Sequence, residues 1–419
     1  MFVPISDVPK YRGKEVSLRG WVYRKREQKE IVFIILRDSS GIIQLACKGI
    51  PEAEKATIES SVTVRGSVKE DKRAPGGYEI QAKELGIIGL AERFPIGRDL
   101  SEEFLRDVRH LWIRSRKLTE IMKVRSEVFR AIHDFCRSRR CHEVQSPIFT
   151  KSACETGAEL FEVKKYGDKK GVYLSLSWQL YAEAMIQALE RIYTITPAFR
   201  AEKSRTVRHL SEYWTAEVEL AWVGYEEIIK FQEDMILHIV KHVLKHCKKE
   251  LKELGRDTTD LEQLTAPFKR IMYADAIKKL GLKWGHDLTD KEERELMEKI
   301  GAKAPVFLER FPREMKAFYM EPDPKDPKVV LGADLLVPRV GEIIGGSERI
   351  YDKEKLLESL KLFKLPKKDY EWYIDLRRYG TVPHSGFGLG IERLVMWLTG
   401  APHIFDTIAF PRTLDRVTP

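Results

Sequence analysis

The chain has 419 residues, which is enough for two or three compact domains. Its 73 Lys and Arg against 64 Asp and Glu give a formal net charge of +9, which suits a polyanionic partner, although the Lys and Glu content of many thermophilic proteins is similar. The five cysteines contain no Cys-x-x-Cys pair, and no apolar run is long enough to span a bilayer. These features argue against a disulfide framework, a structural zinc site and a membrane segment, and we expect a cytoplasmic protein.

The first part of the chain alternates apolar and polar residues in five short segments between residues 15 and 88. Such alternation predicts strands, and turn-forming sequences such as DSSG and APGG separate several of them. Five strands in this length are typical of an OB-type barrel. We therefore predict an OB-fold domain over residues 1–92.

The character of the sequence changes between residues 93 and 116, where proline, glycine and many charges indicate a hinge into a second domain. The segment LTEIMKVRSEVFRAIHDFCRSR follows, and its apolar residues recur at helical spacing. It predicts a long helix, which should end before Pro147. The second domain is predicted to extend over residues 117–419.

Two segments with period-two alternation, RIYTITPAF and YWTAEVELAW, predict strands on either side of a charged loop between residues 191 and 223. One face of the second strand is expected to carry Trp214, Ala216, Val218, Leu220 and Trp222. The other face is expected to carry Tyr213, Thr215, Glu217 and Glu219. This second face is unusually polar.

A further helix is predicted over residues 226–255, and His238, His242 and His246 recur on it every four residues. The spacing invites a metal hypothesis, but one straight helix cannot wrap three ligands around an ion. Two lysines adjoin the histidines, so a solvated basic face is the favoured interpretation.

Three separated segments carry a more specific pattern. The first is the long helix that runs to Pro147; the second is the sequence FRAE, then a loop, Arg208-His209 and Tyr213; the third is GFGLGIER, which ends at Arg393. In this order they resemble the three signature motifs of class II aminoacyl-tRNA synthetases, over nearly the whole chain. The resemblance implies an α+β protein, in which the OB barrel precedes a catalytic domain with an antiparallel sheet flanked by helices. It also implies a homodimer built on the first motif.

The chemistry of this family gives the motifs a physical reason. Amino-acid activation brings a carboxylate to the α-phosphate of ATP, so positioned cations are needed and a protein nucleophile is not. The resemblance implies that Arg200 holds the α-phosphate and the carboxylate, and that Arg393 holds the γ-phosphate, as the two catalytic residues. A single arginine is more often part of a surface salt bridge, but the joint pattern favours these roles. The implied ATP-binding set is Arg200, Glu202, Arg208, His209, Tyr213, Glu342, Gly390, Glu392 and Arg393.

A metal site is implied by two further segments, ADLL and GEIIGGSER. In similar enzymes the positions of Asp334 and Glu342 hold magnesium against ATP, so we expect both to be Mg²⁺ ligands. Gly345 stands where aspartate enzymes commonly have a serine, which suggests fewer protein ligands.

The choice of amino acid is predicted from the segment LSLSWQLYAE. Aspartate enzymes resemble it but have a lysine at the position of Ala182, and without that lysine a second substrate carboxylate would lack its cation. Glu183 could accept a hydrogen bond from an amide NH2 and would repel a carboxylate, unless it is an ordinary exposed helix residue. We therefore expect L-asparagine, with Arg349 on its side-chain carbonyl and Glu155 on its ammonium. The predicted amino-acid-binding set is Glu155, Ser177, Gln179, Ala182, Glu183 and Arg349.

The barrel supplies the expected tRNA contacts. By the resemblance, Phe33 would stack on the middle anticodon base, Gln44 would read the edge of that base, and Arg24 or Arg26, with Arg26 preferred, would hold nearby phosphates. The alternative is that Phe33 belongs to the barrel core.

Together these expectations describe the ATP-dependent attachment of asparagine to its tRNA through an asparaginyl-adenylate. Three alternatives stay open: an aspartyl-tRNA synthetase, including a relaxed form that also charges asparagine tRNA; an asparagine synthetase derived from the same catalytic domain; and a non-enzymatic RNA-binding paralogue. The absence of a lysine at position 182 argues against the first, and the barrel argues against the second. The presence of Arg200, Glu342 and Arg393 argues against the third.

Overall fold

The computed structural model describes residues 2–97, 100–145, 147–151, 159–164, 167, 171–201 and 209–419. The chain divides into two compact units, residues 1–105 and 106–419. Among the described residues, no helix combines the length and the apolar character needed to cross a membrane.

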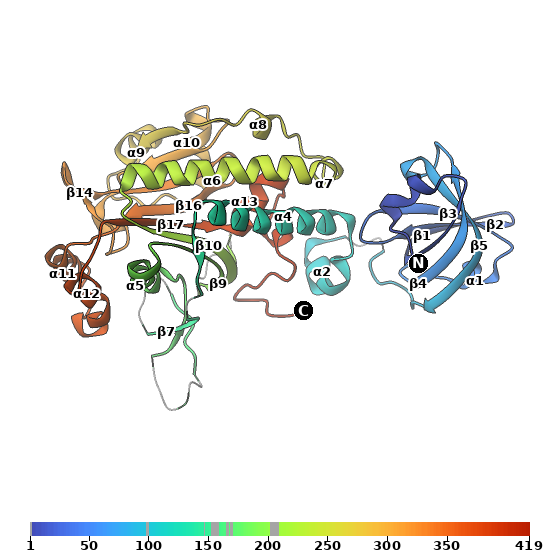
Figure 1. Ribbon diagram of the computed structural model, residues 1–419, viewed down its shortest axis with the longest axis horizontal. Coiled ribbons are helices and arrows are strands. Elements are labelled where there is room, and N and C mark those ends of the chain that lie inside the picture. The colour runs from blue at the N-terminus through green and yellow to red at the C-terminus, as the bar shows by residue number, and fades with distance from the viewer. Residues whose placement is uncertain are drawn as a thin grey trace. The chain divides into compact units, whose positions relative to one another are not determined.

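The first unit is a closed five-stranded barrel, which confirms the predicted OB fold (Figure 1). Around the barrel the strands follow the order β1 (Glu15–Gln28), β2 (Ile31–Arg37), β3 (Ile42–Lys48), β5 (Tyr78–Gly89) and β4 (Ser61–Glu70). Three short helices accompany them, η1 (Ile5–Tyr11), α1 (Pro51–Lys55) and η2 (Pro75–Gly77). Alternate residues of each strand fill the barrel, and its fully buried side chains include Leu18, Ile34, Leu36, Leu45 and Ile80.

The connection after the barrel is shorter than the predicted hinge of residues 93–116. Helices α2 (Glu102–Asp107) and α3 (Arg109–Trp112) occupy its second half. The buried guanidinium of Arg109 donates to the backbone carbonyls of Phe405, Ile408 and Ala409 at 2.7, 2.8 and 2.9 Å. Residues from Arg106 onward therefore belong to the second unit.

The second unit is built on one eight-stranded sheet, which is antiparallel apart from the parallel pairs β11–β12 and β6–β9. In spatial order its strands are β11 (Lys269–Met272), β12 (Val306–Glu309), β15 (Gly332–Val337), β16 (Gly341–Glu348), β17 (His384–Gly390), β10 (Glu212–Ala221), β9 (Arg191–Phe199) and β6 (His142–Glu143). The two remaining strand pairs are β7 (Phe149–Thr150) with β8 (Tyr173–Leu174), and β13 (Pro322–Asp323) with β14 (Asp326–Val330).

Helices flank this sheet, as predicted. They are α4 (Arg116–Ser138), α5 (Gln179–Leu189), α6 (Tyr225–His246), α7 (Lys248–Glu253), α8 (Thr259–Glu262), α9 (Tyr273–Leu280), α10 (Asp290–Lys299), α11 (Lys353–Leu362), α12 (Glu371–Arg378) and α13 (Ile391–Thr399), with the 3-10 turns η3 (Arg313–Met315), η4 (Lys367–Asp369) and η5 (Ile404–Thr407). The predicted long helix is α4, which begins where the hydroxyl of Ser115 accepts the N–H of Leu118 at 3.4 Å.

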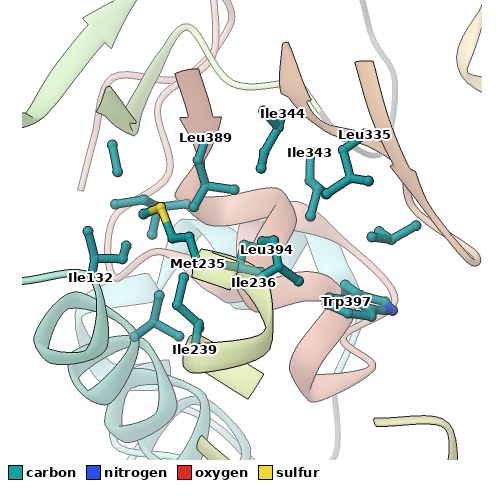
Figure 2. Packing of buried hydrophobic residues seen from close by; sticks show 14 of the residues in the cluster. Ile132, Met235, Ile236, Ile239, Leu335, Ile343, Ile344, Leu389, Leu394 and Trp397 are labelled. Carbon is teal, nitrogen blue, oxygen red and sulfur yellow. The ribbon is translucent and has the colours of Figure 1, made fainter. Parts of the chain in front are cut away.

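The main core lies between the sheet and the helices α4, α6 and α13 (Figure 1). Figure 2 shows apolar side chains from these three helices and from strands β15, β16 and β17 converging there. The labelled members are Ile132, Met235, Ile236, Ile239, Leu335, Ile343, Ile344, Leu389, Leu394 and Trp397. Ala216, Val218 and Leu220 of β10 join the same cluster. Since successive side chains of a strand alternate between its faces, the polar side chains of β10 lie on the opposite face.

Two expectations for this unit need correction. Trp222 does not continue the apolar face of β10, because the strand ends at Ala221 and Trp222 has a left-handed φ of 62° with 63% of its surface exposed. The histidine row is not wholly solvated either. His242 hydrogen-bonds Glu127 Oε2 through Nε2 at 2.7 Å, and His246, which is exposed, stacks on it at 4.4 Å.

Candidate active site

A cleft of about 680 Å³ opens over the polar face of the central strands. It gathers predicted site residues that lie far apart in the sequence. Those that line it are Ser177, Gln179, Arg200, His209, Tyr213, Asp334, Glu342, Arg349, Gly390, Glu392 and Arg393. Three predicted residues, Glu155, Glu202 and Arg208, lie outside the described part of the chain.

The two predicted catalytic arginines both line the cleft. Arg200 directly follows β9, and its backbone N–H donates to the carbonyl of Ser211 at 3.0 Å. Arg393 stands in the first turn of α13, where Nη1 donates to Glu342 Oε2 at 3.1 Å and to its backbone carbonyl at 3.0 Å. Nη2 of Arg393 lies 3.4 Å from His209 Nε2. Sheet and helix thus bring two guanidinium groups into one cleft, as binding of a triphosphate requires.

Glu392 has a different place from the one predicted. Its Oε2 accepts the backbone N–H of Trp214 at 3.0 Å, and its Oε1 pairs with Arg125 Nη1 of α4 at 2.8 Å. Burial raises the pKa of this carboxyl group, and Arg125 opposes the rise. Glu392 therefore links α13, β10 and α4 and also lines the cleft, and its contact to ATP stays a prediction.

The two predicted magnesium ligands stand on neighbouring strands, Asp334 on β15 and Glu342 on β16. A Cβ placed on Gly345 would lie 3.3 Å from Glu342 Oε1 and 3.5 Å from Asp334 Oδ1. The other oxygens have cationic partners, because Lys316 Nζ lies 2.6 Å from Asp334 Oδ2 and Arg393 pairs with Glu342 Oε2. Burial raises the pKa of Asp334 to about 7, Glu342 adds to the rise, and Lys316 opposes it. Two carboxylate oxygens therefore face the small space above a glycine, which suits a hard divalent cation shared with phosphate.

A second group of cleft residues carries both hydrogen-bond donors and acceptors. Ser177 Oγ donates to Glu217 Oε2 at 2.5 Å and accepts the backbone N–H of Gln179 at 3.1 Å. The side chain of Gln179 accepts from Arg349 Nη2 at 2.7 Å. Glu217, Ser177, Gln179 and Arg349 thus form one connected wall, with an acceptor at one end and a cation at the other.

Arg349 is held from behind by β10. Its Nε and Nη2 each lie 3.1 Å from an oxygen of Glu219, and its Nη1 donates to Ser347 Oγ at 2.5 Å. Glu219 pairs across the sheet with Gly386, where a Cβ would overlap the glutamate carboxylate and the carbonyl of Val218. This glycine is therefore required by the buried ion pair, whereas Gly388 and Gly390 of the same motif line the cleft.

Two predicted contacts to the amino acid are corrected by the structure. Ala182 is fully buried in an apolar cluster with Trp178 and Ile186, and it does not line the cleft. Glu183 is 1% exposed and does not line the cleft either, so it is neither a direct acceptor for a substrate amide nor an exposed helix residue. Only the beginning of helix α5, at Gln179, faces the cleft, and both side chains lie further along the helix.

Sequence reasoning missed several cleft residues, among them Glu217 and Lys316. Glu217 was indicated by the unusually polar face of its strand, but the strand alone did not show which of its carboxylates reaches the cleft. Lys316 stands beside Asp334 and carried no signal, because an isolated lysine in a sequence is most often exposed.

The barrel keeps its three predicted anticodon residues on adjacent strands. Phe33 of β2 is half-buried between the buried Val32 and Ile34, so it lies on the outer face and the core alternative is wrong. The guanidinium of Arg26 lies 5.2 Å from the centre of its ring. Gln44 donates to Glu79 Oε2 at 2.6 Å. An aromatic ring with an arginine beside it is a surface on which a nucleic-acid base can stack.

Comparison with known proteins agrees with this architecture. A family model for class II tRNA synthetases (D, K and N) matches residues 101–414, and a model for an OB-fold nucleic acid binding domain matches residues 16–88. The chain is 46% identical to an asparagine–tRNA ligase of Symbiobacterium thermophilum, with 100% of both proteins covered, and 47% identical to one of Thermococcus kodakarensis, with 98% and 97% covered. It is also similar to the solved structure of asparaginyl-tRNA synthetase from Pyrococcus horikoshii complexed with asparaginyl-adenylate, with a TM-score of 0.96, 44% identity and 100% of both chains covered.

Proposed function

Since this chain belongs to the class II tRNA synthetases of the D, K and N group, we propose that it activates asparagine with ATP and attaches it to tRNA. One observation carries the choice of reaction. A single cleft is lined by the two arginines Arg200 and Arg393 and by Glu217 and Arg349, which are connected through Ser177 and Gln179. A triphosphate on the first pair and a carboxamide amino acid on the second would meet within this one cleft.

The arginines act by charge and position. Arg200 would hold the substrate carboxylate and the α-phosphate together, so that the carboxylate oxygen attacks phosphorus and pyrophosphate leaves. Arg393, fixed by Glu342, would neutralise charge on the leaving phosphates, and Tyr213 would stack on the adenine. A terminal ribose hydroxyl of tRNA then attacks the adenylate carbonyl, and AMP leaves.

Magnesium belongs to this proposal, with Asp334 and Glu342 as its ligands. Bound there, the ion would screen the phosphate charges of ATP. The carboxylate oxygens above Gly345 support this placement, since both face one space while Lys316 and Arg393 use the opposite oxygens.

Asparagine would be distinguished from aspartate by donor and acceptor chemistry. Arg349 would donate to the side-chain carbonyl, and Glu217 would accept from the amide NH2. A second carboxylate at this place would face the carboxylate of Glu217 at close range, which is costly in a partly dry site. Glu217 thus takes the role that the sequence assigned to Glu183.

The partners follow from the two units. We propose that Phe33, Gln44 and Arg26 contact the anticodon, and that two copies associate through the first motif in the cytoplasm. The edge strand β6 and the exposed side chains of Ile148 and Phe149 beside this motif support the dimer.

Pyrophosphate exchange into ATP tests the first step directly. We expect exchange that depends on asparagine and Mg²⁺, with aspartate at least about a hundredfold less effective in kcat/KM. Exchange that prefers aspartate would refute the assignment to asparagine, and Glu217→Gln should selectively weaken the discrimination.

A further inference from the structure

A buried network of charges lies next to Gln179, which itself lines the cleft. The carboxylate of Glu183 on α5 receives the Tyr373 hydroxyl at 2.7 and 2.8 Å, His384 Nε2 at 3.0 Å, and Nη2 of Arg377. These donors come from α12 and β17, far from α5 in the sequence. Burial alone would raise the pKa of Glu183, but Arg377 and then His384 outweigh it and lower the pKa well below its usual range. The group is therefore an ionised carboxylate that can only accept hydrogen bonds.

Gln179 connects this network to the cleft. Its Nε2 donates to Glu183 Oε1 at 2.9 Å, and its Oε1 accepts from Arg349 Nη2 at 2.7 Å. An isolated glutamine amide can turn over and exchange its two ends at little cost. Here the ionised carboxylate requires the NH2 end, so the carbonyl end must point at the guanidinium. Glu183 thereby fixes which end of the amide meets Arg349.

The hydrogen bonds of Arg349 show why this orientation matters. Two bonds to Glu219, one to Ser347 and one to Gln179 occupy four of its five N–H groups among the residues that the structure describes. The group that remains is on Nη1, and the side chain of Arg349 lines the cleft. If the amide of Gln179 turned over, its NH2 would face Nη2, and two donors would meet in a buried place. The guanidinium would then have to move.

The same cluster could be taken for a cation site, because ligand atoms of Glu183, Glu219 and His384 lie within 4.8 Å of one another. Each carboxylate, however, already receives a buried guanidinium, Arg377 for Glu183 and Arg349 for Glu219. These arginines balance the two negative charges, so the cluster works as a rigid support and not as a metal site.

We propose that Glu183 is a positioning residue that sets the affinity for the amino acid by fixing the amide of Gln179 and, through it, the guanidinium of Arg349. It touches neither ATP nor the amino acid. The inference deepens the proposed function and rests on it, since Arg349 must contact the substrate side chain for its position to matter.

Glu183→Gln tests the proposal with almost no change of shape. A glutamine at 183 would keep its carbonyl toward Arg377 and His384 and would therefore turn its NH2 toward Gln179, so the amide of Gln179 is no longer held with its carbonyl at Arg349. In asparagine-dependent pyrophosphate exchange we expect the KM for asparagine to rise by about tenfold or more, with the KM for ATP within about twofold of wild type.

Two further variants separate positioning from simple damage. The exchanged pair Gln179→Glu with Glu183→Gln restores an acceptor facing Arg349 and a donor facing the new carboxylate, and should recover much of the lost affinity. Glu233→Gln is the matched control. This buried carboxylate on α6 accepts the backbone N–H of Phe268 at 2.6 Å, a bond that a glutamine carbonyl can also accept, so the same substitution there should leave the KM for asparagine unchanged.

The KM values of these variants decide between a positioning role for Glu183 and a purely structural one. If Glu183→Gln leaves the KM for asparagine unchanged, or raises the KM values for asparagine and ATP equally, the positioning role is refuted. Should this variant not fold, Tyr373→Phe removes one donor to Glu183 and keeps the ring, and a rise of about threefold in the asparagine KM alone is expected; no rise refutes the role. Wild-type protein that shows no asparagine-dependent exchange would refute the proposed function itself.

Discussion

Gly386 on β17 lies opposite Glu219 on β10, and its missing side chain leaves room for the buried carboxylate that holds Arg349. In Gly386→Ala the new methyl group would overlap this carboxylate and the carbonyl of Val218. The backbone carbonyl belongs to the sheet and cannot swing away. The carboxylate must therefore rotate, which breaks both of its bonds to Arg349.

The loss of stability expected for Gly386→Ala follows from these contacts. Overpacking a rigid site costs about 1–3 kcal/mol, and separating a buried ion pair costs about 3–5 kcal/mol when one charge is left without its partner. The two costs overlap, since rotation of the carboxylate relieves part of the overlap. We expect a loss of about 3–5 kcal/mol in the free energy of unfolding of the second unit. For a unit that extends over residues 106–419 the melting temperature should fall by roughly 5–8 °C.

Gly388→Ala is the matched control, two residues along the same strand and on the same face. There the nearest atoms to the new methyl carbon would be Thr215 Oγ1 at 3.6 Å and Glu217 Cγ at 3.7 Å, which is ordinary contact. Alanine in a strand is otherwise slightly more stable than glycine, so this variant should melt within about 2 °C of wild type or above it. Scanning calorimetry of both variants measures the difference. Equal melting temperatures for the two variants would refute the requirement for a glycine at 386.

Three further predictions follow from single contacts. Arg393→Lys should lower kcat in pyrophosphate exchange by about a hundredfold, while the KM for asparagine changes little. The reason is that a lysine cannot donate to Glu342 and to phosphate at once, as the forked guanidinium can. A decrease in kcat of less than about threefold in exchange assays would contradict this prediction. Arg125→Leu should lower the unfolding free energy by about 3 kcal/mol or more in thermal melts, because it strands the buried carboxylate of Glu392, and the double variant with Glu392→Gln should recover part of that loss. Four of the five cysteines are buried, and burial raises the pKa of Cys47 to about 12. Native protein at pH 8 should therefore react with a thiol reagent at no more than one cysteine per chain until it is denatured. Labelling of two or more cysteines in the native protein would contradict the fold.

Alternation and helical spacing were sufficient for the element types. Local periodicity predicted the barrel strands, the helix α4 and the strand pair β9 and β10. It could do so because burial of one face imposes a period of two on a strand and of 3.6 on a helix. The errors occurred where the chain leaves such elements. Trp222 follows a strand whose end is set by a left-handed residue, and the predicted hinge contains a buried arginine that binds carbonyls about three hundred residues later.

The motif residues that the structure describes do meet in one cleft, whereas Ala182 and Glu183 do not line it. A helix sequence shows which residues share a face, but it does not show whether that face meets a cleft or another helix. Glu183 is enclosed because α12 brings Tyr373 and Arg377 against it, which is a contact between segments about 190 residues apart.

By itself the sequence determined the fold class, the class of chemistry and the residues able to supply charge, since these depend on local pattern and on residue type. Only the tertiary structure decided which carboxylate lines the cleft, Glu217, and which lies buried outside it in contact with Gln179, Glu183. That choice depends on long-range packing, because two glutamates with the same chemistry differ only in what the rest of the chain places around them.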